Sequence, residues 1–161
     1  MNLFQFFLQI KFSKYCLSKI GTYFFYALSV SLLCAGIEVK ADNHFEIVAY
    51  PGVNEKTLSV NSLRSIFSMR LRTWPDGTKI RVFVLSDEDD LHQTVSKERL
   101  NVFPYQLRSQ WDRLVYSGTG QAPTKVNSVE EMLAKVANTP GAIGYLWRTD
   151  INENVSILQI K

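Results

Sequence analysis

Residues 128–147 read SVEEMLAKVANTPGAIGYLW, and this stretch decides the fold class. Ser128 and Glu131 have the spacing of a capping box, which predicts that a helix begins here, and apolar side chains then recur at helical spacing. The Pro-Gly pair at 140–141 stops that helix, and the apolar run 142–147 follows at once with the composition of a buried strand. A helix that leads directly into a strand is the building unit of a layered α/β domain.

Strand and helix patterns also alternate on the N-terminal side of this stretch. Residues 45–50 are rich in β-forming side chains and stop at a Pro-Gly pair. Residues 79–85 form an almost continuous apolar run, which is typical of a strand covered on both faces. Between them Ser59 is suited to cap a short helix whose apolar side is formed by Leu58, Leu63 and Phe67.

Two more elements complete the predicted domain. Pro104 suits a first helical turn, and Gly118 is expected to end that helix. Its predicted apolar stripe consists of Leu107, Trp111, Leu114 and Val115. Residues 155–160 predict a last short strand at an edge of the sheet. Together these elements predict a single three-layer α/β domain with a mixed, largely parallel sheet over residues 42–161.

The first 41 residues have the pattern of an export signal. Lysines precede an uncharged apolar run at 20–33, and the triplet Val-Lys-Ala at 39–41 puts small residues where a signal peptidase requires them. We therefore predict cleavage before Asp42 and a periplasmic protein. An uncleaved membrane anchor over 20–37 is the alternative, and lipidation at Cys34 is a minor one.

Length and charge restrict what the remaining domain can do. The chain has 161 residues, which favours one domain and excludes a multidomain enzyme. Of 18 basic and 15 acidic side chains, four lysines and one glutamate precede residue 42, which leaves 14 of each sign in residues 42–161. A balanced charge gives no electrostatic attraction to a polyanion, so nucleic acid is excluded as a partner.

The usual catalytic and metal-binding patterns are missing from residues 42–161. Both cysteines, Cys16 and Cys34, lie in the signal segment, and His44 and His92 are the two histidines of the chain. No metal-ligand spacing, nucleophile turn or Ser-x-x-Lys motif can be assembled from these residues. The glycines around Thr119 fit the end of a helix rather than a phosphate loop. We therefore predict a non-enzymatic protein without a cofactor.

Several short motifs occur in an order that resembles a known family. They are Leu58-Ser59 leading to Ser65-Ile66-Phe67, Trp74-Pro75-Asp76-Gly77, Trp111 with Tyr116-Ser117-Gly118, and VANTPGAIGYL at 136–146. In this order, and over most of residues 45–147, the sequence is similar to the small phosphate-transporter-type periplasmic substrate-binding proteins of the type-II superfamily. The most specific part is the Pro-Gly-Ala-Ile-Gly-Tyr segment at 140–145.

This resemblance implies a function in transport. Full-length members have two α/β lobes that close over an oxyanion, whereas residues 42–161 suffice for one lobe. The resemblance implies a domain that binds phosphate or a related oxyanion for an ABC importer, with a transporter permease or another periplasmic protein as its partner. The alternative is a degenerate lobe that binds no small molecule and serves as a periplasmic protein-interaction module.

The loop that the resemblance assigns to the anion departs from the family pattern. In the family this loop follows the strand that corresponds to 79–85 and carries an aspartate, then Ser-Gly-Thr, then an arginine. Here residues 86–94 read SDEDDLHQT, so the candidate ligand-binding residues are Ser86, His92 and Thr94 with neighbouring backbone N–H groups. Four carboxylates oppose an anion here, because like charges 4 Å apart repel by about 4 kcal/mol at a protein surface.

The residues of this loop also have a purely structural interpretation. Asp87 is suited to be the N-cap of a helix that runs to about Leu100, with further acids in its first turn. His92 would then be a solvated helix residue, and the basic side chains that follow would lie on helix surfaces. Those side chains are Arg99, Arg108 and Arg113. A further alternative is that two copies of the lobe pair to rebuild a cleft.

Overall fold

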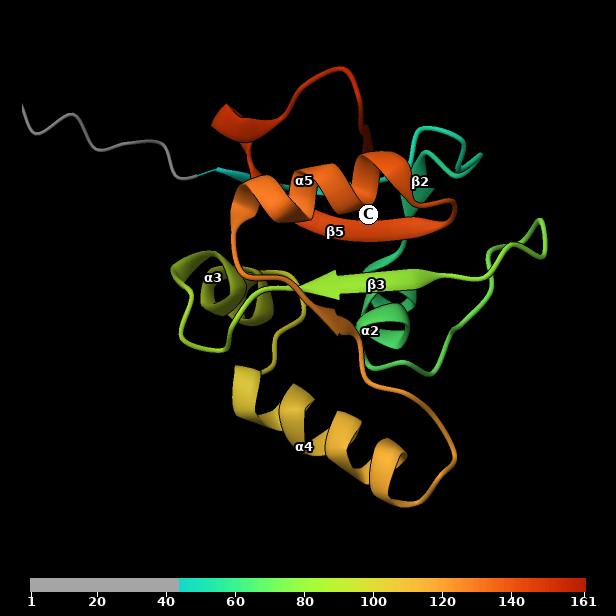
Figure 1. The fold of residues 1–161 in the computed structure, drawn as a ribbon, viewed down its shortest axis with the longest axis vertical. Helices are drawn as coiled ribbons and strands as arrows, with labels where there is room; N and C mark the ends of the chain where they lie inside the picture. Colours follow the sequence, from blue (N-terminus) through green and yellow to red (C-terminus); the bar gives the residue numbers. More distant parts are fainter. Residues whose placement is uncertain (1–43) are drawn as a thin grey trace, which may run out of the picture. The chain divides into compact units, whose positions relative to one another are not determined.

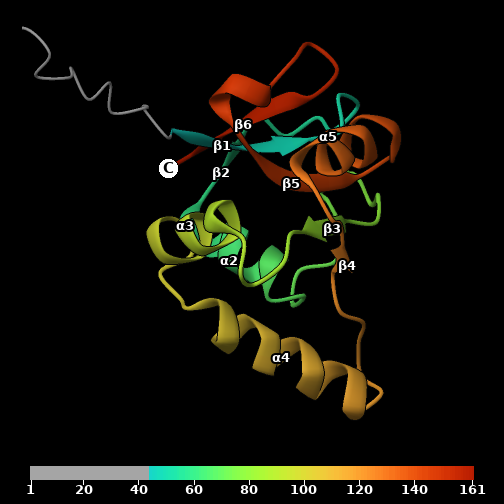
Figure 2. The same ribbon diagram turned by 60° about the vertical axis from the view of Figure 1, so that its left-hand side comes forward.

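A six-stranded sheet forms the centre of the structure (Figure 1), and its strand order is β2-β6-β1-β5-β3-β4, with all six strands labelled in Figure 2. The structure is a computed structural model that describes residues 44–161. The predicted signal segment, its cleavage site and the alternative anchor lie outside these residues. The elements in chain order are β1 Phe45–Ala49, β2 Thr57–Leu58, α2 Val60–Phe67, β3 Arg81–Val84, α3 Asp90–Glu98, α4 Pro104–Tyr116, β4 Thr124–Lys125, α5 Val129–Asn138, β5 Ala142–Trp147, the 3₁₀ turn η1 Arg148–Asp150 and β6 Ser156–Ile160.

The sheet is mixed, as predicted. Strand β1 is antiparallel to both β5 and β6, whereas β3 is parallel to β5 and to β4, and β2 is parallel to β6. The prediction that β6 forms an edge is wrong, because the two-residue strand β2 pairs outside it. So short a strand carries no readable alternation of apolar and polar side chains, and the sequence therefore gave no sign of it.

Helices cover the sheet on both faces, which confirms the three-layer prediction. Helix α5 packs on one face, against β5, β3 and β1, and helices α2 and α3 cover the other (Figure 2). Helix α4 packs on α3 and lies further from the sheet. None of the helices within residues 44–161 is long and apolar enough to cross a membrane.

The stretch that decides the fold class forms α5 and β5. Ser128 caps α5, since its Oγ accepts from the Glu131 N–H at 3.2 Å, but the Glu131 carboxylate accepts from Asn127 N–H at 2.9 Å rather than from Ser128. Gly144 lets α5 approach the sheet, because a Cβ there would lie 2.6 Å from Met132 Sδ. Gly141, with φ of 74°, turns the chain into β5 where a side chain would collide with Lys79 O.

The core lies within the described residues and is continuous from β1 to β6. Trp111 and Tyr145 are its largest fully buried side chains. Each fully buried apolar side chain contributes about 1.5–3 kcal/mol, so this core is a main source of stability for the described residues. One expectation about α4 is wrong: Val115, predicted to lie in the apolar stripe, is 49% exposed, while Leu107 and Trp111 face the core.

Candidate functional site

The junction between β3 and α3 is the region where the sequence predicts an anion site. The chain leaves β3 after Val84, and Asp89 N–H then donates to Ser86 O at 3.0 Å, which closes a turn. Helix α3 begins only after this turn, so Asp89 and not Asp87 is its N-cap. The prediction of Asp87 as N-cap is therefore wrong by two residues. The helix ends at Glu98, close to the predicted end at Leu100.

The N-terminus of α3 is bound by a carboxylate of this chain. Asp89 Oδ1 accepts from Leu91 N–H at 2.9 Å and from His92 N–H at 3.4 Å. These are the backbone groups that would otherwise be available to hold an oxyanion. The carboxylate of Asp89 therefore stands where a bound anion would receive these hydrogen bonds.

His92 points into the core and connects the junction to β5. Its side chain is 1% exposed, and its Nδ1 lies 2.5 Å from the hydroxyl oxygen of Tyr145. The same hydroxyl accepts from Leu85 N–H at 2.9 Å. The prediction that His92 is a solvated helix residue is therefore wrong. Since Nε2 faces the carboxylate of Asp87, we assign the ring proton to Nε2, which leaves Nδ1 to accept from Tyr145.

Burial determines which charge states these two side chains adopt. Burial lowers the pKa of His92 below 6.5, and the neighbouring Arg108 lowers it further, whereas Asp87 and Asp89 oppose the shift. Burial also raises the pKa of Tyr145 above its ordinary value of 10.0. Both groups are therefore neutral near pH 7, and the pair holds no positive charge with which to attract an anion.

Two polar atoms of α3 are buried without a hydrogen-bond partner among the described residues. They are His92 Nε2 and Ser96 Oγ, which lie one turn apart on the same helix. The nearest acidic atom to His92 Nε2 is Asp87 Oδ1 at 3.8 Å, too far for a hydrogen bond. This side of α3 therefore has two polar atoms whose capacity for hydrogen bonding is unused.

Asp87 and Arg108 close the outer side of the junction. Arg108 donates through Nη2 to Asp87 Oδ1 at 2.8 Å and through Nε to Oδ2 at 3.1 Å. This bidentate hydrogen bonding to Arg108 lowers the pKa of Asp87 and raises that of Arg108. The Arg108 guanidinium also lies over the Trp111 ring, 5.3 Å from its centroid. Arg108 lies on the surface of a helix, as predicted, and its side chain also bridges α4 to the loop before α3.

The three predicted ligand residues do not line one cavity. Thr94 lies two residues after His92 and so faces the opposite side of α3, where its hydroxyl donates to Asp90 O at 2.7 Å. It lines an open cavity of about 650 Å³ together with Asp90, Gln93, Lys97, Glu98 and Trp147. Neither Ser86 nor His92 is among the lining residues of that cavity. Within the part of the chain that the structure describes, no cluster of His, Cys, Asp and Glu can hold a metal.

Sequence reasoning missed Tyr145 as a partner of His92, and it missed the Asp87–Arg108 pair. One signal was available for Tyr145. The alternation of side chains along 142–147 places Tyr145 on the face opposite to Gly144, and so away from α5. No comparable local signal exists for Asp87 and Arg108, which are 21 residues apart and belong to different elements.

The fold is similar to about half of the fold of known solute-binding proteins. Similar solved structures include a phosphate ABC transporter substrate-binding protein of Clostridium perfringens with bound phosphate, with a TM-score of 0.58 and 13% identity over 72% of this chain and 44% of that one. PstS from Borrelia burgdorferi gives a TM-score of 0.57 and 16% identity over 73% of this chain and 47% of that one. An ABC-type phosphate transport receptor from Vibrio cholerae gives 0.52 and 15%, over 72% and 45%.

These comparisons confirm the predicted resemblance at the level of the fold. The chain spans less than half the length of each of these structures. No protein-family model and no curated protein matches the sequence. These structural neighbours are described as transport proteins, and that this domain is not an enzyme stays a prediction.

Proposed function

We propose that the protein is an exported, non-catalytic solute-binding-protein-like domain that works through contact with a periplasmic or membrane protein, such as an ABC transporter permease, and holds no free phosphate. The position of Asp89 carries this proposal. Its carboxylate already accepts the N–H groups of Leu91 and His92 at the start of α3. A phosphate ion would have to displace this carboxylate and lie among the remaining acids of the loop.

Electrostatics at the junction support the same conclusion. Arg108 uses Nε and Nη2 to bind Asp87, so two of its three nitrogens are unavailable to an anion at this junction. Glu88, Asp89 and Asp90 add three carboxylates close to the same helix end. Each of them repels an oxyanion by about 1 kcal/mol or more at contact distance, whereas a helix terminus contributes about 0.3–1 kcal/mol. Repulsion therefore exceeds what the helix N-terminus can contribute.

Phosphate binding is the second candidate, and one observation favours it. His92 Nε2 and Ser96 Oγ are buried without partners among the described residues, and a structural neighbour from Clostridium perfringens holds phosphate. On this alternative, Ser86 and His92 are the side chains of the junction that bind the anion. Thr94, which faces the other side of α3, would contact it only after a rearrangement.

Isothermal titration with inorganic phosphate separates the two candidates. We expect no saturable heat when residues 42–161 are titrated with millimolar phosphate in a low-salt buffer. Sulfate serves as the matched oxyanion control. A saturable one-to-one isotherm with phosphate, accompanied by shifts of the His92 ring resonances in NMR spectra, would overturn the proposal and establish the second candidate.

Export is tested separately on the full chain. A C-terminally tagged protein should be released with the periplasmic fraction by osmotic shock, and its N-terminal sequence should begin at Asp42. A protein that remains with the cytosolic fraction contradicts the proposed location. A membrane-bound protein that retains residues 20–37 instead supports the anchored form.

A further inference from the structure

The outer face of α4 carries large aromatic side chains that the domain leaves exposed. Tyr116 is 89% exposed, Tyr105 67% and Phe103, just before the helix, 52%. The rings of Phe103 and Tyr105 are stacked, with centroids 5.8 Å apart and planes at 16°. The opposite side of the helix is occupied by Leu107 and Trp111, which pack into the domain. The exposed aromatic side chains therefore contribute nothing to this domain's own core.

The spacing of the outer residues gives the face an internal symmetry. Tyr105, Ser109, Asp112 and Tyr116 follow one another at intervals of four, three and four residues, which places them in one stripe along the helix. The stripe is about 16 Å long at 1.5 Å per residue. Its spacing and its terminal tyrosines are the same from either direction, with Ser109 and Asp112 between them.

We propose that this stripe is a self-association surface, on which α4 of a second copy of the chain lies antiparallel across a twofold axis. A twofold interface uses the same patch on both subunits, so that each contact occurs twice. In this register Tyr105 packs against Tyr116 of the partner subunit. Ser109 faces Asp112 of the partner subunit and can donate its hydroxyl hydrogen bond to that carboxylate.

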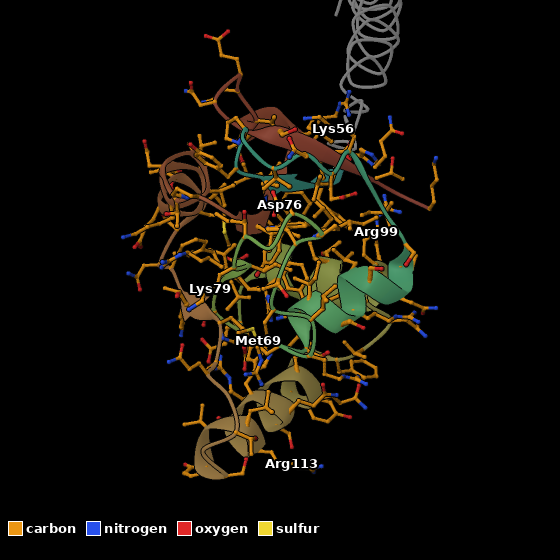
Figure 3. All side chains as sticks on the ribbon, turned by 90° about the vertical axis from the view of Figure 1, so that its right-hand side faces the viewer. Lys56, Met69, Asp76, Lys79, Arg99 and Arg113 are labelled. Carbon is orange, nitrogen blue, oxygen red and sulfur yellow. The ribbon has the colours of Figure 1, made fainter. Side chains whose placement is uncertain are left out.

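Charge favours the antiparallel direction. Asp112 and Arg113 make no ion pair within 4.0 Å among residues 44–161, although Asp112 already helps to raise the pKa of Arg108 in its own subunit, and Figure 3 shows Arg113 on the outer side of α4. The Arg108 side chain is 37% exposed and binds Asp87 through Nε and Nη2 alone, which leaves Nη1 free. The antiparallel register brings Asp112 of the partner subunit near this guanidinium. A parallel pair would place the two Asp112 carboxylates side by side, where they repel.

The exposed aromatic area approaches the lower limit of a specific interface and reaches it together with the polar rim. Phe103, Tyr105 and Tyr116 together expose about two full aromatic side chains, or about 300–500 Å² at about 150–250 Å² for each ring. Two subunits therefore bury about 600–1,000 Å² of aromatic surface, to which the polar rim adds. Specific interfaces begin at about 1,000–1,200 Å², and those at this lower limit are weak and transient. We therefore expect a dissociation constant in the micromolar range.

Sedimentation equilibrium of residues 42–161 tests the dimer. Between about 1 µM and about 1 mM the protein should pass from monomer to dimer. Tyr116→Ala and Tyr105→Ala should each raise the dissociation constant at least about tenfold, as expected when the large aromatic side chains of an interface are truncated. Ile157→Ala, which removes an exposed apolar side chain from β6, should leave the constant unchanged. A monomer throughout this range, or a dimer indifferent to both tyrosine variants, overturns the proposal.

Disulfide trapping tests the register. Residues 42–161 contain no cysteine, so introduced thiols are the only ones present. An equimolar mixture of Ser109→Cys and Asp112→Cys should form a heterodimer linked between positions 109 and 112 on mild oxidation. A mixture of Asp112→Cys with Glu153→Cys, which lies in the exposed loop before β6, should stay unlinked. A dimer without the 109–112 bond shows that the antiparallel register is wrong. Neither result affects the phosphate titration, so the two proposals fail independently.

Discussion

The β3–α3 junction and the outer face of α4 lie on adjoining helices, but their side chains find partners in opposite ways. At the junction the chain supplies the partners itself, with Asp89 for the helix N-terminus, Tyr145 for His92 and Asp87 for Arg108. On the outer face of α4, Tyr105 and Tyr116 remain exposed. This difference supports our proposals that the exposed face of α4 binds a second copy of the chain and that the junction, whose polar groups are bonded within the chain, holds no free phosphate.

The largest expected effect comes from removing one hydroxyl group at the junction. Tyr145→Phe leaves Leu85 N–H and His92 Nδ1 buried without a partner, because both contact that hydroxyl. Each unsatisfied buried group costs about 1–3 kcal/mol, so the variant should lose about 2–4 kcal/mol of unfolding free energy in urea denaturation.

Tyr105→Phe is the matched control, since it also removes one tyrosine hydroxyl, but from the exposed face of α4. Its hydroxyl makes no hydrogen bond among the described residues, and the change should stay within about 0.5 kcal/mol. Equal losses in the two variants would contradict the contrast between a closed junction and an open helix face.

The second effect is a pH dependence that belongs to the junction. The pKa of His92 in the folded protein lies below 6.5, so between the two pKa values the unfolded chain binds a proton that the folded protein does not. Stability is therefore fully present above pH 6.5 and falls as the pH drops below it, by at most about 1.4 kcal/mol per pH unit. The groups that face His92 are Tyr145, Asp87, Arg108 and Asp89.

Urea denaturation at several values between about pH 5 and pH 8 measures this slope. His92→Gln should abolish the slope above about pH 5, whatever its effect on overall stability. His44→Gln, which changes a half-exposed histidine at the start of β1, should retain it. The pKa of Asp87 is lowered from 3.8, so the stability that Asp87 contributes is lost only in more acidic solution and does not overlap this window. A slope that persists in His92→Gln would assign the dependence to another group.

Most helices and strands could be predicted from the sequence, whereas the contacts at the β3–α3 junction could not, for a physical reason. The strand at 142–147, the capped helix before it and the layered architecture depend on local periodicity and on turn residues, which a single sequence displays. The junction depends on contacts between residues 53 and 60 positions apart, namely His92 with Tyr145 and Leu85 with Tyr145. A histidine beside an acidic run looks solvated until the strand that covers it is placed. Val115 was misassigned because a helical stripe does not reveal where its buried face ends.

The smallest expected effect concerns the carboxylate that occupies the end of α3. Asp89→Ala removes the N-cap that binds Leu91 and His92 N–H, and it should cost about 1 kcal/mol of unfolding free energy. The freed N–H groups then become available to an anion, although Glu88 and Asp90 remain nearby. Replacing chloride by phosphate at constant ionic strength should therefore stabilise Asp89→Ala slightly, by less than about 0.5 kcal/mol, and leave the original protein unchanged. If phosphate stabilises both proteins equally, then Asp89 does not exclude the anion. In that case the hydrogen bonds at the junction are no argument against an oxyanion ligand.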